Sequence, residues 1–182
     1  MKIRLLILTI AICTMGQSMA QNTMLDRNGT ASFFSEAPME DIEAINEKVL
    51  GAIDLKKGTL AVSMLMKGFH FERSLMEEHF NENYLESDKF PKATFTGTIR
   101  DFSKLNFLKN GSFEAEVEGE LEIHGVKKPL KTKVKFDVSD SKLKAATVFK
   151  IEIEKFDIEV PTLVIKNIAE IVEVKALFNF SI

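Results

Sequence analysis

The chain has 182 residues, 45% of them apolar, and its 24 Lys and Arg against 27 Asp and Glu give a formal net charge of −3. This composition is typical of one folded domain and excludes a disordered chain. The near balance of charge excludes a protein devoted to nucleic-acid binding, which needs a strongly basic face.

The first twenty residues have the pattern of a secretory signal peptide. Lys2 and Arg4 precede an apolar run over residues 5–12, and Ser18 and Ala20 form a small-x-small cleavage pattern. We expect cleavage after Ala20, which leaves residues 21–182 as one domain and places the protein in the periplasm or outside the cell. The apolar run is too short for a permanent membrane span.

The only cysteine, Cys13, lies inside this segment. The mature chain therefore has no cysteine, which excludes disulfides, thiol catalysis and cysteine-bound zinc.

Alternation of apolar and polar residues predicts about eight strands after the leader. Turn signals separate several of them at residues 57–58, 110–111 and 139–141. In chain order the expected strands cover residues 30–34, 48–55, 60–66, 95–99, 113–123, 126–138, 143–153 and 172–182.

A single helix is expected between the third and fourth of these strands. Ser74 and Glu77 have capping-box spacing, with Ser74 as N-cap, and the helix should end before Pro91. Its inner side is expected to consist of Leu75, Met76, His79 and Phe80. A second short helix is expected over Thr162–Ala169.

The clearest pair of strands lies between residues 112 and 138. Glutamates alternate with apolar residues in the first strand, and lysines do so in the second. A two-residue turn at His124 and Gly125 sets Ile123 opposite Val126, and the same register sets glutamates opposite lysines along the whole hairpin. Lys128 then falls on the apolar face, so we expect a bulge at Lys128–Pro129.

Eight antiparallel strands with one apolar face each can bury that face by closing into a barrel, which also removes the strand edges. The interior of such a barrel is either filled by side chains or holds a small ligand. A two-sheet sandwich with a solid core is the alternative arrangement of the same strands. If a tunnel is present, its walls are expected to comprise Leu60, Val62, Met64, Phe95, Ile99, Phe113, Val117, Leu121, Leu130, Val134, Phe136, Phe149, Ile151, Val174, Phe178 and Phe180.

No catalytic motif is evident. The three histidines, His70, His79 and His124, fall on a strand, a helix and a turn without metal-ligand spacing. The paired carboxylates are typical of a solvated face. We therefore expect no catalytic residue, no metal, no cofactor and no enzyme activity, and expect His79 to form a hydrogen bond between helix and barrel.

Three passages resemble the YceI-like family, and the first, between Lys67 and Ile99, is the most specific. Its matching residues are Leu75, Met76, His79–Glu82, Tyr84, Leu85, Ser87, Phe90, Pro91, Ala93, Phe95, Gly97 and Ile99. The second passage matches at Gly119, Leu121, Ile123–Val126 and Lys128, and the third at Phe156–Ile158 and Pro161.

This resemblance implies an all-β fold, namely an elongated eight-stranded antiparallel lipocalin-like barrel with one or two short helices. It also implies an exported carrier of a long apolar lipid, such as a polyisoprenoid, an isoprenoid quinone or a similar amphiphile, held inside the barrel. The expected partners are that lipid and, transiently, a membrane, but no nucleic acid. The alternative function is an envelope scaffold with a filled core that binds a protein partner. The sequence leaves the oligomeric state open.

Overall fold

The computed structural model describes residues 23–36, 41–107, 109–159 and 169–181. The strands are β1 (Thr23–Ser35), β2 (Ile42–Asp54), β3 (Thr59–Leu65), β4 (His70–Phe71), β5 (Lys92–Ile99), β6 (Gly111–Ile123), β7 (Val126–Ser139), β8 (Lys142–Glu152) and β9 (Ile171–Ser181). The helical elements are α1 (Ser74–His79), the π-helical turn η2 (Phe80–Tyr84), and the 3₁₀ turns η1 (Met66–Gly68), η3 (Phe102–Lys104) and η4 (Ile153–Phe156).

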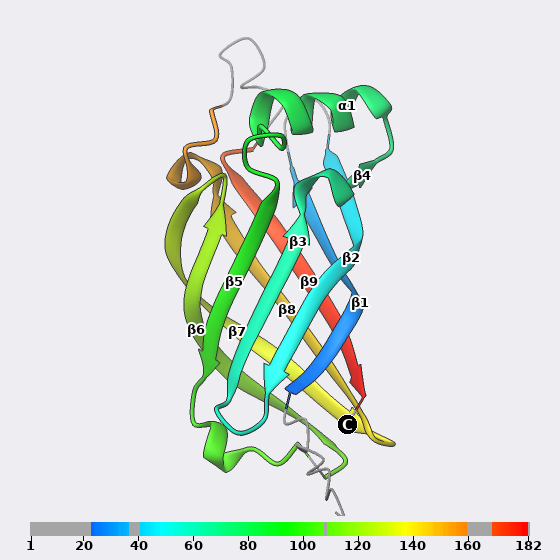
Figure 1. Ribbon diagram of the computed structural model, residues 1–182, viewed down its shortest axis with the longest axis vertical. Coiled ribbons are helices and arrows are strands. Elements are labelled where there is room, and N and C mark those ends of the chain that lie inside the picture. Colours follow the sequence, from blue (N-terminus) through cyan, green and yellow to red (C-terminus); the bar gives the residue numbers. More distant parts are fainter. Residues whose placement is uncertain (1–22, 37–40, 108, 160–168, 182) are drawn as a thin grey trace, which may run out of the picture.

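Eight of the strands close into an antiparallel barrel. The order around the sheet is β1-β9-β8-β7-β6-β5-β3-β2, and pairing of β1 with β2 closes the ring. Among the described strands, the two-residue strand β4 pairs with β2 alone. Figure 1 shows an elongated barrel with α1 lying across one end and η3 at the opposite end. The expected fold class is thus confirmed, and the sandwich is excluded because the sheet has no open edge between β1 and β2.

The register predicted for the hairpin of β6 and β7 is confirmed. Thirteen consecutive pairs run from Ile123↔Val126 to Gly111↔Val138. His124 and Gly125 form the turn, with φ values of 53° and 74°. Two central residues with positive φ match the right-handed twist of the flanking strands.

The bulge expected at Lys128–Pro129 is absent. Lys128 pairs directly with Leu121 and is half-buried. It is one of the alternate residues of β7 that face the barrel interior. The pairing of β7 with β8 begins only at Val134, so Lys128 lies on a part of β7 that does not pair with β8. The aliphatic stem of Lys128 can therefore cover apolar surface while its ammonium group reaches water past the unpaired edge. Such an edge also tolerates proline, which lacks an N–H.

The helix differs from its prediction at two points. Arg73, and not Ser74, is the N-cap, and no side chain caps the helix. The Glu77 carboxylate instead accepts a hydrogen bond from the backbone N–H of Phe71 at 3.3 Å, which ties the helix to β4. Leu75 is 59% exposed and does not belong to the inner side.

Strands β1 and β2 are longer than expected, with 13 residues each. Register shifts between Asp26 and Ala31 interrupt the alternation of apolar and polar residues in β1. The first half of this strand could therefore not be recognised from that alternation. The signal peptide at residues 1–20 and the helix expected over Thr162–Ala169 lie outside the described residues, apart from Ala169, which is in no regular element.

Candidate functional site

An apolar cavity of about 280 Å³ occupies the end of the barrel that α1 covers. Its walls come from barrel strands, and its roof comes from η1, α1, η2 and the segment that follows β8. The lining residues are Ala31, Phe33, Ser35, Ile42, Met64, Met66, Phe69, Phe71, Met76, His79, Phe80, Tyr84, Leu85, Ala93, Leu121, Ile123, Phe149, Ile151, Ile153, Ile158, Val172 and Val174.

The helical segment contributes one side to this cavity. Met76, His79, Phe80 and Tyr84 follow the three- and four-residue spacing of a helix face, and all four line the cavity. The π-helical turn inserts one extra residue per turn and continues the helix to Tyr84. The segment therefore presents a mainly apolar stripe to the cavity, in which Phe80 is buried and His79 stays exposed to solvent.

Four phenylalanines form an aromatic cluster at the helix end of the cavity. Phe33, Phe69, Phe71 and Phe80 have ring centroids 5.0–5.7 Å apart, and all four line the cavity. Rings at this separation attract one another in tilted and offset arrangements. The cluster joins β1, β4 and the helical segment around one end of the empty space.

Few polar groups reach the cavity. Of the described lining residues only Ser35, His79 and Tyr84 carry a polar side chain, and none is Lys, Arg, Asp or Glu. The Ser35 hydroxyl accepts a hydrogen bond from the backbone N–H of Ala169 at 3.0 Å. Burial raises the pKa of the Tyr84 phenol, so this group stays neutral and can donate a hydrogen bond. The cavity is therefore suited to an apolar occupant with, at most, a small polar end.

His124 connects three segments at this end of the barrel. Its Nε2 lies 3.0 Å from a carboxylate oxygen of Glu86, and its Nδ1 lies 3.2 Å from the carbonyl oxygen of Phe156. The Phe90 ring packs edge-on against the imidazole at 4.4 Å, and the side chain is 9% exposed. The turn between β6 and β7 is thus fastened both to the segment after η2 and to η4.

The hydrogen bond expected of His79 is not found. His79 lines the cavity, and its imidazole forms no hydrogen bond with any described residue. His124 provides a hydrogen-bonded connection at this end of the barrel, because the hairpin turn carries its side chain to the loop that follows the helix.

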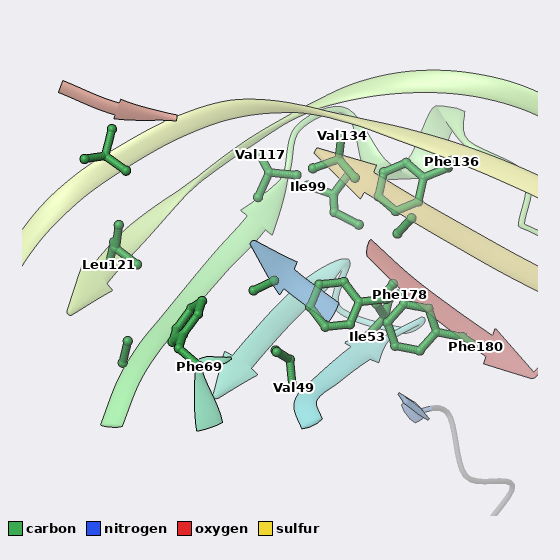
Figure 2. Close-up of a cluster of buried hydrophobic side chains, with 14 of the residues drawn as sticks. Val49, Ile53, Phe69, Ile99, Val117, Leu121, Val134, Phe136, Phe178 and Phe180 are labelled. Carbon is green, nitrogen blue, oxygen red and sulfur yellow. The ribbon is translucent and has the colours of Figure 1, made fainter. Parts of the chain in front are cut away.

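The opposite end of the barrel is filled. Phe102, Phe107, Phe113 and Phe136 pack with ring centroids 5.1–5.5 Å apart. Figure 2 shows Phe136 within the buried cluster that includes Ile99, Val117 and Val134. A small void of about 40 Å³ remains between this end and the cavity, and the two spaces share no lining residue.

The sixteen predicted lining residues therefore fall into three groups. Those that line the cavity are Met64, Leu121, Phe149, Ile151 and Val174. Those that line the small void are Leu60, Val62, Val134, Phe178 and Phe180. Those that line neither space are Phe95, Ile99, Phe113, Val117, Leu130 and Phe136. All sixteen lie on the barrel strands, but only the first group meets at the helix end.

The sequence prediction missed most of the roof. Phe71 and Tyr84 lie in short elements, and Phe69 and Leu85 lie next to such elements, so no strand alternation can be recognised there. Met76, His79 and Phe80, which were expected on the inner side of the helix, do line the cavity. Tyr84 continues their helical spacing, and that signal could have identified it as well.

Among the described residues, no three His, Cys, Asp or Glu side chains are grouped in a way that could hold a metal ion. No helix in the described part of the chain is long and apolar enough to cross a membrane.

The geometry defines a class of protein: an antiparallel eight-stranded barrel with an apolar cavity closed by a helix at one end. Residues 24–180 match the model of the YceI-like domain, and the chain belongs to this family. A search of curated proteins finds no match.

Three solved structures share the fold. A polyisoprenoid-binding domain from Saccharophagus degradans superposes with a TM-score of 0.76 at 13% identity, covering 88% of this chain and 98% of that one. BcnA of Burkholderia cenocepacia gives a TM-score of 0.69 at 17% identity over 83% and 95% of the two chains. A variant of the Campylobacter jejuni YceI protein, with monobromobimane as guest, gives a TM-score of 0.63 at 14% identity, covering 81% of this chain and 88% of that one.

Proposed function

We propose that the protein binds an isoprenoid or other long-chain lipid, with the apolar chain inside the cavity under α1. The observation that supports this proposal is the cavity itself, whose lining is apolar except at Ser35, His79 and Tyr84. Water against such a lining finds few hydrogen-bond partners, so a hydrocarbon chain displaces it at little cost. The polyisoprenoid-binding domain with the same fold supports the same class of ligand.

The affinity of such a site comes from removal of hydrocarbon from water. Each methylene buried contributes about 0.8 kcal/mol before the losses from association and chain ordering. The absence of charged groups among the described lining residues means that the site offers little to a soluble polar metabolite.

Two neighbouring residues of β8 provide a matched test. Phe149 lines the cavity, whereas Val148 is 55% exposed on the outer face of the barrel. Phe149→Lys places an ammonium group in an apolar space and should weaken binding of a dansyl-labelled fatty acid at least about tenfold. Val148→Lys should leave the affinity unchanged.

The test is read together with far-UV circular dichroism and thermal unfolding of both variants. Val174→Trp, which fills the cavity without adding charge, serves if Phe149→Lys does not fold. Full binding by folded variants that charge or fill the cavity would refute the proposal.

We also propose that the protein is exported, with residues 1–20 removed after Ala20. The basic start, apolar run and small-residue site of the leader support this. The mass of the protein isolated from its own source reports the cleavage directly, because a mature chain begins at Gln21. Transient contact with a membrane stays a prediction.

A further inference from the structure

The cavity occupies only one part of the barrel interior, and its volume limits what can be enclosed. An apolar cavity of about 150 Å³ holds one benzene molecule. The cavity of about 280 Å³ therefore accommodates roughly a dozen carbons of a lipid tail. A longer chain would need space farther along the barrel axis.

Phe95 lies at the boundary between the cavity and the smaller void. Its neighbour two residues earlier on β5, Ala93, lines the cavity, and so does its cross-strand partner Leu121 on β6. Its other cross-strand partner, Val62 on β3, lines the small void. Phe95 lines neither space, and its partners place it at the level along the barrel where the two sets of lining residues meet.

A pair of glycines holds the Phe95 ring in this place. Gly97 and Gly119 face each other across β5 and β6. A Cβ atom added to either would lie 2.6 Å or 2.8 Å from the ring carbon Cζ of Phe95. The Phe95 ring thus lies against the bare backbone of these two glycines, which fixes its position at this level of the barrel.

Beyond this boundary the interior is closely packed. Val117 and Phe136 are fully buried, Ile99 is 2% exposed, and none of them lines either space. A tail that extended past Phe95 would have to displace side chains that fit together at the density of a protein core.

We propose that the barrel selects lipid tails by length, with Phe95 as the stop: it encloses about a dozen carbons, and any remainder of a longer chain stays outside the helix end. The proposal rests on the proposed lipid-binding function and defines which part of a lipid the site takes. Selection by length follows because carbons beyond the stop gain no burial.

The test measures dissociation constants for saturated fatty acids of increasing length, below their micelle concentrations, by displacement of the dansyl probe. The head group is constant, so the slope against length reports the tail alone. Each enclosed methylene should tighten binding about fourfold, and the affinity should level off beyond roughly a dozen enclosed carbons. A slope that continues undiminished to the longest acid would overturn the length limit while supporting lipid binding. No binding at any length would refute the proposed function itself.

Phe95→Ala and Phe113→Ala form a matched pair. Both phenylalanines are half-buried on the inward face of neighbouring strands, but Phe113 packs against Phe107 and Phe136 at the filled end. Phe95→Ala should move the levelling point to longer tails, and Phe113→Ala should leave it where it is. Phe95→Leu repeats the test if the alanine variant does not fold. An unchanged levelling point in folded Phe95 variants, or an equal shift in both positions, would show that Phe95 is not the stop.

Discussion

His124 is a positioning residue for the cavity. The segments that it fastens carry cavity-lining side chains: Leu85 precedes Glu86, and Ile153 and Ile158 flank Phe156. Both of its ring nitrogens face hydrogen-bond acceptors, a carboxylate and a carbonyl oxygen. A ring nitrogen that carries a proton donates it to the acceptor beside it. The geometry of the roof therefore depends on a side chain that does not itself line the cavity.

Replacement of this histidine tests its role. His124→Phe keeps a ring against Phe90 but leaves the Glu86 carboxylate and the Phe156 carbonyl without this partner. It should lower the free energy of unfolding by about 1–3 kcal/mol, measured by chemical denaturation. His70→Phe is the control, because His70 is 67% exposed and its contact with Glu77 is a surface pair worth about 0–1 kcal/mol. Equal small losses in both variants would contradict the role given to His124.

At the scale of elements, the hairpin of β6 and β7 carries a row of ion pairs, some between register partners and some between diagonal neighbours. Lys131 pairs with its register partner Glu118 at 2.8 Å. Glu116 lies opposite Lys133, yet it pairs with Lys131 at 2.8 Å. Lys133 pairs in turn with Glu114 at 3.1 Å, and Lys127 with Glu120 at 2.9 Å. Long side chains reach diagonal neighbours across a twisted ladder, so a correct register does not by itself fix the partners.

The pKa of Glu116 gives this element a pH dependence. Hydrogen bonds from Lys131, and secondarily from Arg100, lower the pKa of this carboxyl below its ordinary value. The folded state therefore binds the proton more weakly than the unfolded state. The stabilisation is fully present above the ordinary glutamate pKa and is lost as the pH falls through the lowered one.

We predict that Glu116→Gln lowers the free energy of unfolding at neutral pH. The difference from the native chain should shrink as the pH falls below the ordinary glutamate pKa and vanish only below the lowered pKa of the folded state. Urea denaturation at a series of pH values measures this. Glu47 provides the control, since it is exposed on β2 and forms no ion pair with any described residue. A difference for Glu116→Gln that persists at acid pH would mean that the ion pair is not its source.

Features of the fold that depend on local signals could be predicted from the sequence, and those that depend on irregular register or tertiary contacts could not. The register of β6 and β7 followed from strict alternation, opposite charges and a glycine turn, all of which are local signals. The start of β1 was missed because its register shifts break the alternation that reveals a strand. The N-cap at Ser74 was wrong because Glu77 bonds to Phe71 in β4, and that contact depends on tertiary structure.

For the whole molecule, alternation predicts which side chains face inward but not which of them enclose empty space. Phe113 and Phe149 both face inward, yet Phe113 packs against Phe107 and Phe136 while Phe149 lines the cavity. The difference arises from the segment around η3, which fills one end of the barrel, and from α1, which roofs the other without filling it (Figure 1). The expected tunnel along the interior is therefore a cavity at the helix end.

The most direct test of the central claim is native mass spectrometry of the mature protein purified from its own source, followed by solvent extraction. The account predicts a chain that begins at Gln21 and carries a discrete added mass, which extracts as an isoprenoid or acyl lipid. A ligand-free mass that stays unchanged after incubation with prenyl and acyl lipids would contradict the account.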